Sequence, residues 1–161
     1  MGQLNVRNGV RLGIDVGTVR VGVARSDPHG MLALPVATVA RGDGDIGEIL
    51  RHATEFDAIE AIVGLPLALS GGDTASTADA RGFASRLDTA APHLAVRLVD
   101  ERLTTVSAHQ ALRASGRNSR TSRPVIDQVA AVIILQHALD SERAGGTPPG
   151  TLVHPAGGSD S

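Results

Sequence analysis

The stretch RLGIDVGTVRVGVARSD, residues 11–27, constrains the fold of this 161-residue chain more than any other. Alternation of apolar residues with small or polar ones predicts two short strands joined at Gly17-Thr18. The same alternation separates the two faces of the first strand, so that its apolar side chains point one way. The residues of this apolar face are Leu12, Ile14 and Val16.

Asp15 lies on the opposite face of that strand, between Gly13 and Gly17 at i−2 and i+2. A buried carboxylate is costly unless a cation, a metal or a set of hydrogen-bond donors accompanies it. The glycine neighbours leave space above the backbone. Gly22 likewise leaves space above the second strand, because it has no side chain. The pattern predicts an aspartate that binds a metal or faces a phosphate. The alternative is a solvated aspartate on an exposed sheet face, with glycines that serve only the turn.

The composition predicts one soluble, cytoplasmic domain. A chain of 161 residues is long enough for one core but not comfortably for two. No apolar run approaches the ~20 residues of a membrane span, and the N-terminus lacks the order of a secretory signal. The absence of cysteine excludes disulfides and zinc–thiolate sites.

The charge distribution says more about partners than the net charge of −2, which gives no global basic field. All 15 basic residues are arginine, and the arginine fork suits bidentate phosphate recognition, although a codon bias would explain the absence of lysine equally well. The aromatic residues are only Phe56 and Phe83, so base stacking on an aromatic platform is not expected.

The order of predicted elements indicates an α/β fold with a mixed five-stranded sheet and helices on both faces. Three strands with short connections should be antiparallel, and two later strands that alternate with helices should join in parallel. The predicted strands span 11–16, 19–26, 32–40, 59–65 and 95–100, and the predicted helices span 46–56, 74–87, 104–114 and 124–141. We expect a flexible lead over 1–10, a folded domain over 11–142 and a disordered Gly/Pro-rich tail over 143–161.

A second acidic cluster, Asp100-Glu101-Arg102, ends the last predicted strand. The carboxyl edge of a strand is where α/β folds usually place their sites. Alternation sends Asp100 and Glu101 to opposite faces, so the pattern alone leaves open which of them joins Asp15. A solvated loop with an ion pair to Arg102 is the alternative.

Asp127 lies in the first turns of the last predicted helix, where an acid complements the helix dipole and needs no further role. Ala130 and Ala131 follow at i+3 and i+4. Such small residues would let the helix approach the sheet closely and bring Asp127 over the strand edge. The apolar stripes predicted for this helix are Ile126, Val129, Ile133 and His137, and Val125, Val132 and Gln136.

Three separated acids in a chain without cysteine favour oxygen coordination of Mg²⁺ or Mn²⁺. Two such ions, roughly 3.5–4 Å apart, can activate a water molecule and stabilise the leaving oxygen of a phosphodiester. The six histidines show no zinc-ligand spacing and are interpreted as surface or helix-face residues.

Four motifs in the chain resemble the YqgF/RuvX family of RNase H-like Holliday junction resolvases, also described as pre-16S rRNA nucleases. They are GIDVGTVRVGVARSD at 13–27, VGLPLALSG at 63–71, DERLTT at 100–105 and VIDQVAAVIILQ at 125–136. The resemblance spans about residues 11–139. It implies an RNase H-like three-layer fold, a divalent metal and hydrolysis of structured nucleic acid, either four-way junction DNA or precursor rRNA.

The resemblance also implies the roles of the acids. Asp15, Glu101 and Asp127 match the family's acidic positions, as catalytic residues and metal ligands. Asp100 is kept as an alternative ligand, because Glu101 ranks above it on the resemblance and not on strand geometry.

Five arginines are expected to bind nucleic acid. Arg20 and Arg102 match arginines that are characteristic of the family. Arg117, Arg120 and Arg123 precede the last helix, where the family pattern is rich in lysine; arginine keeps the charge and changes the hydrogen-bond fork.

Two hypotheses from other classes remain. The stretch from Gly13 to Thr18 also resembles the first phosphate loop of actin-like ATPases and sugar kinases, but those proteins place a nucleotide between two such domains. A nucleic-acid-binding ribosome-assembly factor without catalysis fits the net charge of −2, and the retention of three acids argues against it. For a resolvase, symmetric cutting of a junction needs two active sites, so we expect a homodimer.

Overall fold

The computed structural model describes residues 7–103 and 123–153, with the backbone alone for 103 and 123–127. A six-stranded mixed sheet forms its centre. The elements in chain order are β1 (Val10–Val16), β2 (Arg20–Ser26), β3 (Ala33–Ala40), α1 (Asp45–Glu55), β4 (Ala58–Leu65), α2 (Ala75–Ala90), β5 (Ala95–Asp100), the 3-10 turn η1 (Glu101–Leu103), α4 (Arg123–Gly145) and β6 (Thr151–Leu152). The helix predicted over 104–114 lies outside the described residues.

The strand order is β3-β2-β1-β4-β5-β6. β1 pairs antiparallel with β2, and β2 with β3, as short hairpin connections require. β1 and β4 are parallel, as are β4 and β5, because helices separate these strands in the chain. The predicted mixed topology is therefore confirmed, with one strand more than expected.

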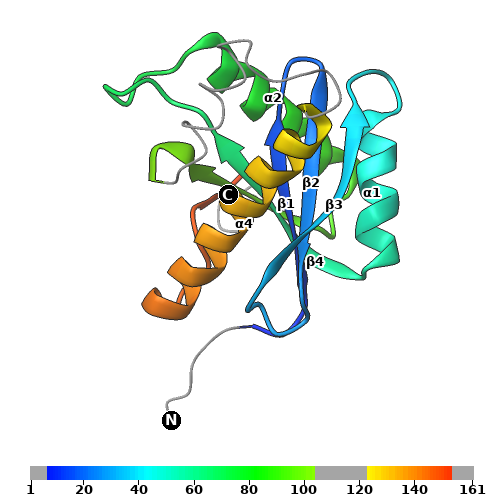
Figure 1. Cartoon of the computed structure of the whole chain (residues 1–161), viewed down its shortest axis with the longest axis vertical. Helices are drawn as coiled ribbons and strands as arrows, with labels where there is room; N and C mark the ends of the chain where they lie inside the picture. The colour runs from blue at the N-terminus through cyan, green and yellow to red at the C-terminus, as the bar shows by residue number, and fades with distance from the viewer. Residues whose placement is uncertain (1–6, 104–122, 154–161) are drawn as a thin grey trace, which may run out of the picture.

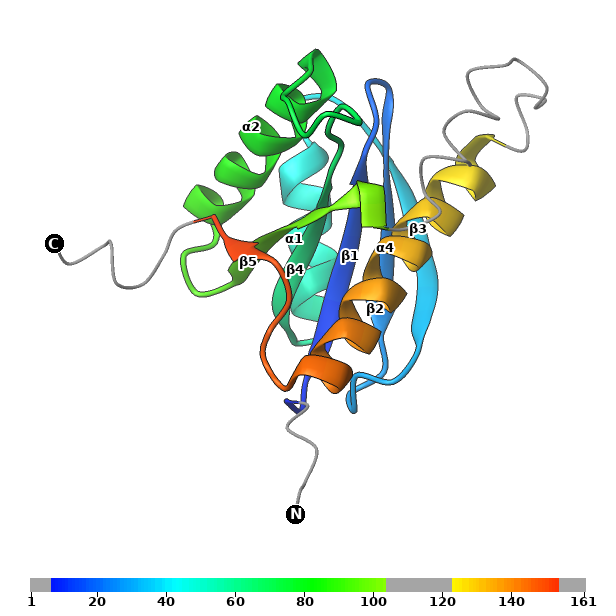
Figure 2. The same cartoon turned by 90° about the vertical axis from the view of Figure 1, so that its left-hand side faces the viewer.

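The helices cover the two faces of the sheet unequally. Figure 1 and Figure 2 show α1 and α2 on one face and α4 lying across the other. The alternation in β1 matches these layers, since Leu12 and Ile14 belong to the core under α1 and α2, together with Phe83 of α2. A second core lies beneath α4 and includes Ile62 of β4.

α4 packs against the sheet through its small residues. Ala130 and Ala131 are fully buried, and a Cβ added to Gly13 would lie 2.6 Å from Leu135 Cβ and 2.8 Å from the Ala131 carbonyl. The close approach predicted from Ala130 and Ala131 is therefore confirmed, whereas Val129 of the neighbouring stripe is 36% exposed. Residues 129–135 are all aliphatic, and the close approach permitted by alanine and glycine selects which of them are buried.

Described structure extends into the ranges predicted as lead and tail. α4 continues to Gly145, and β6 follows at Thr151–Leu152, inside the range predicted as a tail. Two residues in a Gly/Pro-rich stretch carry no alternation that could have revealed this strand. At the other end, the predicted lead includes Arg7, whose guanidinium bonds Glu60 and Glu142. Within residues 7–103 and 123–153, no helix combines the length and hydropathy of a membrane span.

Candidate active site at the carboxyl edge of the sheet

Asp15 is buried near the end of β1, with 1% of its surface exposed. Gly22 of β2 is its direct partner across the antiparallel pair, and the parallel register of β1 and β4 brings Gly64 to its other side. Thr38 of β3 stands opposite Gly22 and extends the line. We call these four residues, Thr38, Gly22, Asp15 and Gly64, the Asp15 row. The carboxylate is thus flanked across the sheet by two residues without side chains.

Glu101 shares the face of Asp15. It is the first residue of η1, directly after β5, and is only 4% exposed. A Cβ added to Gly64 would lie 2.6 Å from Oε2 of Glu101, so the glutamate carboxylate occupies the space above that glycine. The strand ends between Asp100 and Glu101, and the structure resolves the choice that alternation left open by bringing Glu101 to the Asp15 row.

Asp100 is engaged elsewhere, with Arg102. The Arg102 backbone N–H donates to Oδ1 of Asp100 at 2.9 Å, and its Nη2 donates to Oδ2 at 2.6 Å. This hydrogen-bonded guanidinium holds the pKa of the Asp100 carboxyl below its ordinary value. The position does not support the alternative in which Asp100 is the metal ligand, because its oxygens already accept from an arginine.

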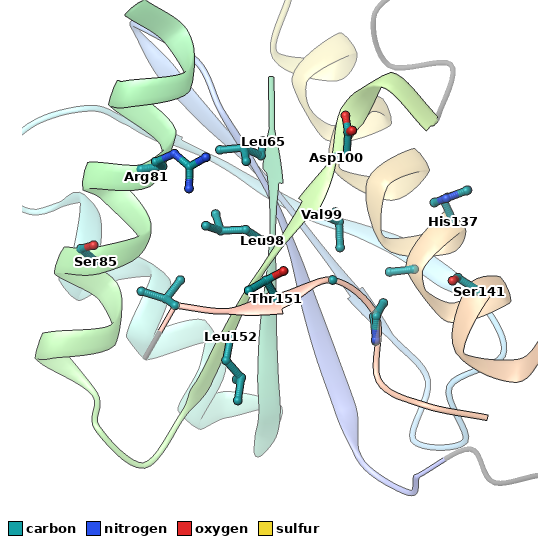
Figure 3. Close-up of a pocket in the computed structure, with 14 residues that line it drawn as sticks. Leu65, Arg81, Ser85, Leu98, Val99, Asp100, His137, Ser141, Thr151 and Leu152 are labelled. Atoms are coloured by element: carbon teal, nitrogen blue, oxygen red, sulfur yellow. The ribbon is translucent and has the colours of Figure 1, made fainter. Parts of the chain in front are cut away.

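Asp100 also borders a cavity of about 490 Å³ between α2 and α4, partly covered by β6. Figure 3 shows Asp100 at one end of this cavity and Arg81 of α2 on its other side. Among the lining residues that the structure describes, neither Asp15 nor Glu101 occurs. The cavity and the pair of acids are therefore separate features.

The start of α4 lies over the Asp15 row. Gln128 donates from Nε2 to the hydroxyl of Thr38 at 3.0 Å, which fixes the first turns of the helix above this line. Asp127 is the residue before Gln128, within α4. Its side chain lies outside the described residues, and the predicted convergence of three carboxylates stays a prediction.

The glycines near Asp15 differ in what lies above them. The space over Gly13 is filled by α4, and a Cβ on Gly17 would meet the Arg20 carbonyl at 2.6 Å within the β1–β2 turn. Neither glycine keeps space for a ligand, contrary to the prediction, because the helix and the turn approach the backbone there. Gly22 and Gly64 adjoin Asp15, and the space over Gly64 is filled by Glu101 and Ile134. Gly64 was missed as a site residue, although a glycine inside an apolar strand signals close approach.

The predicted arginines are spread over several elements. Arg20 opens β2, two strand positions from Gly22. Arg102 is held against protein groups, by Asp100 and by the Leu69 carbonyl, which accepts from Nη1 at 3.2 Å. Arg117 and Arg120 lie outside the described residues, as does the side chain of Arg123, the first residue of α4.

The acids present are chemically suited to a hard divalent cation. Asp15 and Glu101 supply carboxylate oxygens on one face, the ligands that Mg²⁺ and Mn²⁺ prefer. In the part of the chain with described side chains, no group of three or more His, Asp or Glu residues could hold a metal ion. The side chain of Asp127 lies outside that part of the chain. The finding therefore covers only metal sites formed without Asp127.

A second cluster of buried charge lies at the other end of the same face and was not foreseen. Arg7 bonds Glu60 at 2.8 Å and Glu142 at 2.9 Å, Arg11 reaches Glu142 at 3.3 Å, and Arg97 reaches Glu60 at 2.5 Å. We call these five residues the arginine–glutamate network. Burial raises the pKa of the Glu142 carboxyl, but the hydrogen bond from Arg7 and the charges of Arg7 and Arg11 outweigh it, so the pKa is lowered.

Comparison with known proteins identifies relatives over nearly the whole chain. The RuvX family, described as Holliday junction resolvase, matches residues 9–141. A protein of Clavibacter michiganensis subsp. michiganensis is 65% identical over 151 residues, covering 92% of this chain and 93% of the relative. A protein of Leifsonia xyli subsp. xyli is 63% identical over 154 residues, covering 93% and 97%. Both relatives are named as candidate pre-16S rRNA nucleases.

Solved structures of RuvC share the fold. T. thermophilus RuvC in complex with a Holliday junction substrate has a TM-score of 0.54 at 19% identity, over 88% of this chain and 99% of that one. A second Thermus thermophilus RuvC structure has a TM-score of 0.50 at 19% identity, over 87% and 99%. This likeness agrees with the predicted RNase H-like architecture, and at this identity it bears on the fold alone.

Proposed function

Because this chain belongs to the RuvX family of Holliday junction resolvases, we propose that it is an endonuclease that hydrolyses phosphodiester bonds in structured nucleic acid. The observation that carries the proposal is the meeting of Asp15 and Glu101 on one face of the sheet, at its carboxyl edge. The two acids come from strands that are not adjacent, with Gly64 between them. Gly64, which has no side chain, lets the Glu101 carboxylate approach the sheet beside Asp15, so that the two acids can serve one cation.

Asp15, Glu101 and Asp127 are the residues that would hold Mg²⁺ or Mn²⁺. When bound, such ions supply an activated water and stabilise the leaving oxygen of the phosphodiester. Asp15 would present its carboxylate oxygens to such an ion from β1, and Glu101 would present its own from the residue after β5. Gly22 and Gly64 flank Asp15 without side chains of their own, and the Glu101 carboxylate lies above Gly64.

The course of α4 supports a place for Asp127 in this set. Gly13 lies beneath Ala131 and Leu135, and Asp15 follows two residues later on β1. Two strand residues advance about 6.6 Å, which is the length of about four helix residues. The turn over Asp15 is therefore the one that begins near Asp127. We expect the three carboxylates within roughly 4–8 Å of one another without metal.

Arginine contacts to phosphates would carry most of the binding energy. Arg20 lies at the start of β2, near the row, and Arg117, Arg120 and Arg123 belong to the segment that leads into α4. Each phosphate contact releases counterions, so a triple alanine variant of the last three should flatten the salt dependence by about one unit per lost contact. An unchanged salt dependence of binding would show that these arginines do not contact phosphates.

The substrate is a four-way DNA junction or precursor rRNA, in keeping with the family description and with the names of the relatives. We place the activity in the cytoplasm, where both occur in a bacterial cell, and in a homodimer if the junction is cut symmetrically.

The test is cleavage of labelled junction DNA and precursor rRNA side by side, with Mg²⁺, Mn²⁺ or EDTA. Metal-dependent cutting of either substrate that EDTA abolishes is the expected result. Binding without any cutting would instead support an assembly factor without catalysis.

A further inference from the structure

Leu69 is the most exposed large apolar residue that the structure describes, at 95%. It belongs to the connection between β4 and α2. Figure 1 shows this connection projecting beyond the sheet, on the same side as η1. Single exposed apolar residues are common and need no explanation by themselves. The surroundings of Leu69 are what distinguish it.

The connection is a tight, hydrogen-bonded turn that places Leu69 at its tip. The N–H of Gly71 donates to the Ala68 carbonyl at 2.8 Å, and the N–H of Ala68 donates to the Gly72 carbonyl at 2.9 Å. Gly71 adopts φ +94°, a conformation that favours glycine. We call residues 68–72 the Leu69 turn. Tips of such turns usually carry polar residues or glycine, so a leucine there is unexpected.

The Leu69 turn is fastened to the strand end that carries Glu101. Arg102 donates from Nη1 to the Leu69 carbonyl at 3.2 Å and from Nη2 to Asp100 at 2.6 Å. Its Nη1 also lies 3.4 Å from where a Cβ on Gly71 would be. At the base of the connection, the hydroxyl of Thr77 in α2 donates to the Pro66 carbonyl. Arg102 follows Glu101 in the chain, so the acid and the turn share one anchor.

We propose that Leu69 is a wedge that inserts between neighbouring bases of the nucleic acid beside the acidic site, and that Arg102 is the positioning residue that holds it there. The proposal rests on the proposed function and deepens it. Apolar side chains inserted in this way unstack a base step and kink the strand. A turn that is already rigid loses little conformational entropy on binding, which favours insertion. A kinked or branched substrate would accept the wedge more readily than continuous duplex, since its bases are already partly unstacked.

Leu32 offers a matched control. It is 55% exposed, it also lies in a turn, and that turn follows β2 at the end of the sheet away from Asp15. A Leu32→Ser variant therefore removes the same apolar group from a turn that the proposal does not use.

The experiment uses a four-way DNA junction and a precursor rRNA fragment, each with 2-aminopurine at its branch or strand junction, in EDTA so that no cleavage occurs. The parent protein should raise the fluorescence of at least one of them, because unstacking relieves quenching. Leu69→Ser should abolish the rise and weaken binding roughly tenfold, the value of burying one leucine side chain. Leu69→Met should restore most of the signal, and Leu32→Ser should behave as the parent.

Arg102→Lys tests the positioning role. It keeps the charge and loses the fork that joins Asp100 to the Leu69 carbonyl. We expect a reduced fluorescence rise, faster amide exchange at Ala68 and Gly71, and an unchanged salt slope of binding. A flatter salt slope with unchanged exchange would make Arg102 a phosphate contact and overturn its positioning role.

Two results would overturn the wedge: a parent protein that binds without a fluorescence rise on either substrate, or a Leu69→Ser variant that equals the parent in fluorescence and affinity. Each can occur while metal-dependent cleavage is intact, so failure of the wedge is distinguishable from failure of the nuclease proposal. A wedge signal without cleavage in Mg²⁺ or Mn²⁺ would overturn the nuclease instead.

Discussion

The face of the sheet beneath α4 buries acids at both ends, and their neighbours differ. At one end, Glu60 and Glu142 receive guanidinium groups from Arg7, Arg11 and Arg97. At the other end, the residues that adjoin Asp15 across the sheet are Gly22 and Gly64. The first arrangement surrounds two glutamates with three arginines, and the second places two residues without side chains beside a carboxylate.

This difference indicates that the two ends of the sheet face have different roles. Arginine forks around a carboxylate fix the packing of α4 against β1 and β4, and they leave no position for a ligand. Glycines beside a carboxylate let other groups approach the backbone, as Glu101 and Ile134 do over Gly64. One helix spans both ends, since α4 bonds the arginine–glutamate network through Glu142 and the Asp15 row through Gln128. We therefore expect substitutions at one end to change stability and at the other to change catalysis.

The largest effect is expected for Asp15→Asn. The substitution keeps the size of the side chain and removes the charge, so single-turnover cleavage in Mg²⁺ should fall on the order of 10³-fold, equivalent to about 4 kcal/mol. Nucleic-acid binding in EDTA should remain within about twofold, because arginine contacts carry it. Full cleavage by the purified variant would refute the role of Asp15.

The next largest effect is expected for Glu142→Ala, which should lower stability and leave cleavage unchanged. Removing one partner of a buried ion pair leaves Arg11, 1% exposed, without its carboxylate, and should lower the unfolding free energy by about 3 kcal/mol. Denaturant titration measures this loss, and cleavage per folded molecule should match the parent at low temperature. A variant as stable as the parent but catalytically dead would show that the two ends are not separable.

Gly64→Ala sharpens the comparison, because it adds one methyl group at the acidic end. The new Cβ would lie 2.6 Å from Glu101 Oε2 and from Ile134 Cδ1. We expect stability to fall by about 1–3 kcal/mol and cleavage to fall as Glu101 is displaced. Gly82→Ala in α2 is the control, since no atom lies within 4 Å and helix propensity predicts a gain of about 0.5–1 kcal/mol. If Gly64→Ala cleaved the substrate as fast as the parent, Glu101 would have no role in the reaction.

The smallest expected effect is a pH dependence at the arginine–glutamate end. The pKa of Glu142 is lowered from its ordinary value of 4.5, so the native state releases this proton more readily than the unfolded chain. Its contribution is complete above about pH 4.5 and is lost as the pH falls through the lowered pKa. The stability difference between the parent and Glu142→Gln should be constant near neutrality and shrink below that value. A difference that grows with acidity would contradict this assignment.

The face on which Asp15 lies could be predicted from sequence because its signal is local. Alternation in β1 put Asp15 on the face opposite Leu12 and Ile14, and the structure agrees. The choice between Asp100 and Glu101 could not be made by alternation, since it depends on where β5 stops and η1 begins. The family resemblance selected Glu101, and the backbone explains that selection.

The arginine–glutamate end could not be predicted, because its partners are distant in the chain. Arg7 and Glu142 are 135 positions apart, and Arg7 and Glu60 are 53 apart. The only local signal was Glu60, a single acid inside an apolar run. For α4, Ala130 and Ala131 indicated the side that approaches the sheet, but the sequence did not show that Gly13 on β1 lies beneath that side.

The short strand β6 has a consequence for how copies of this protein can associate. Sheet edges with unpaired N–H and C=O groups recruit strands from other molecules. Thr151 and Leu152 occupy part of the outer edge of β5, and the N–H of Val153 donates to the Val96 carbonyl at 2.9 Å. On the opposite edge, Pro35 of β3 lacks an N–H donor. Both features reduce the part of each sheet edge that can pair with another molecule, which favours self-association through helices and loops over a sheet continued from one molecule into the next.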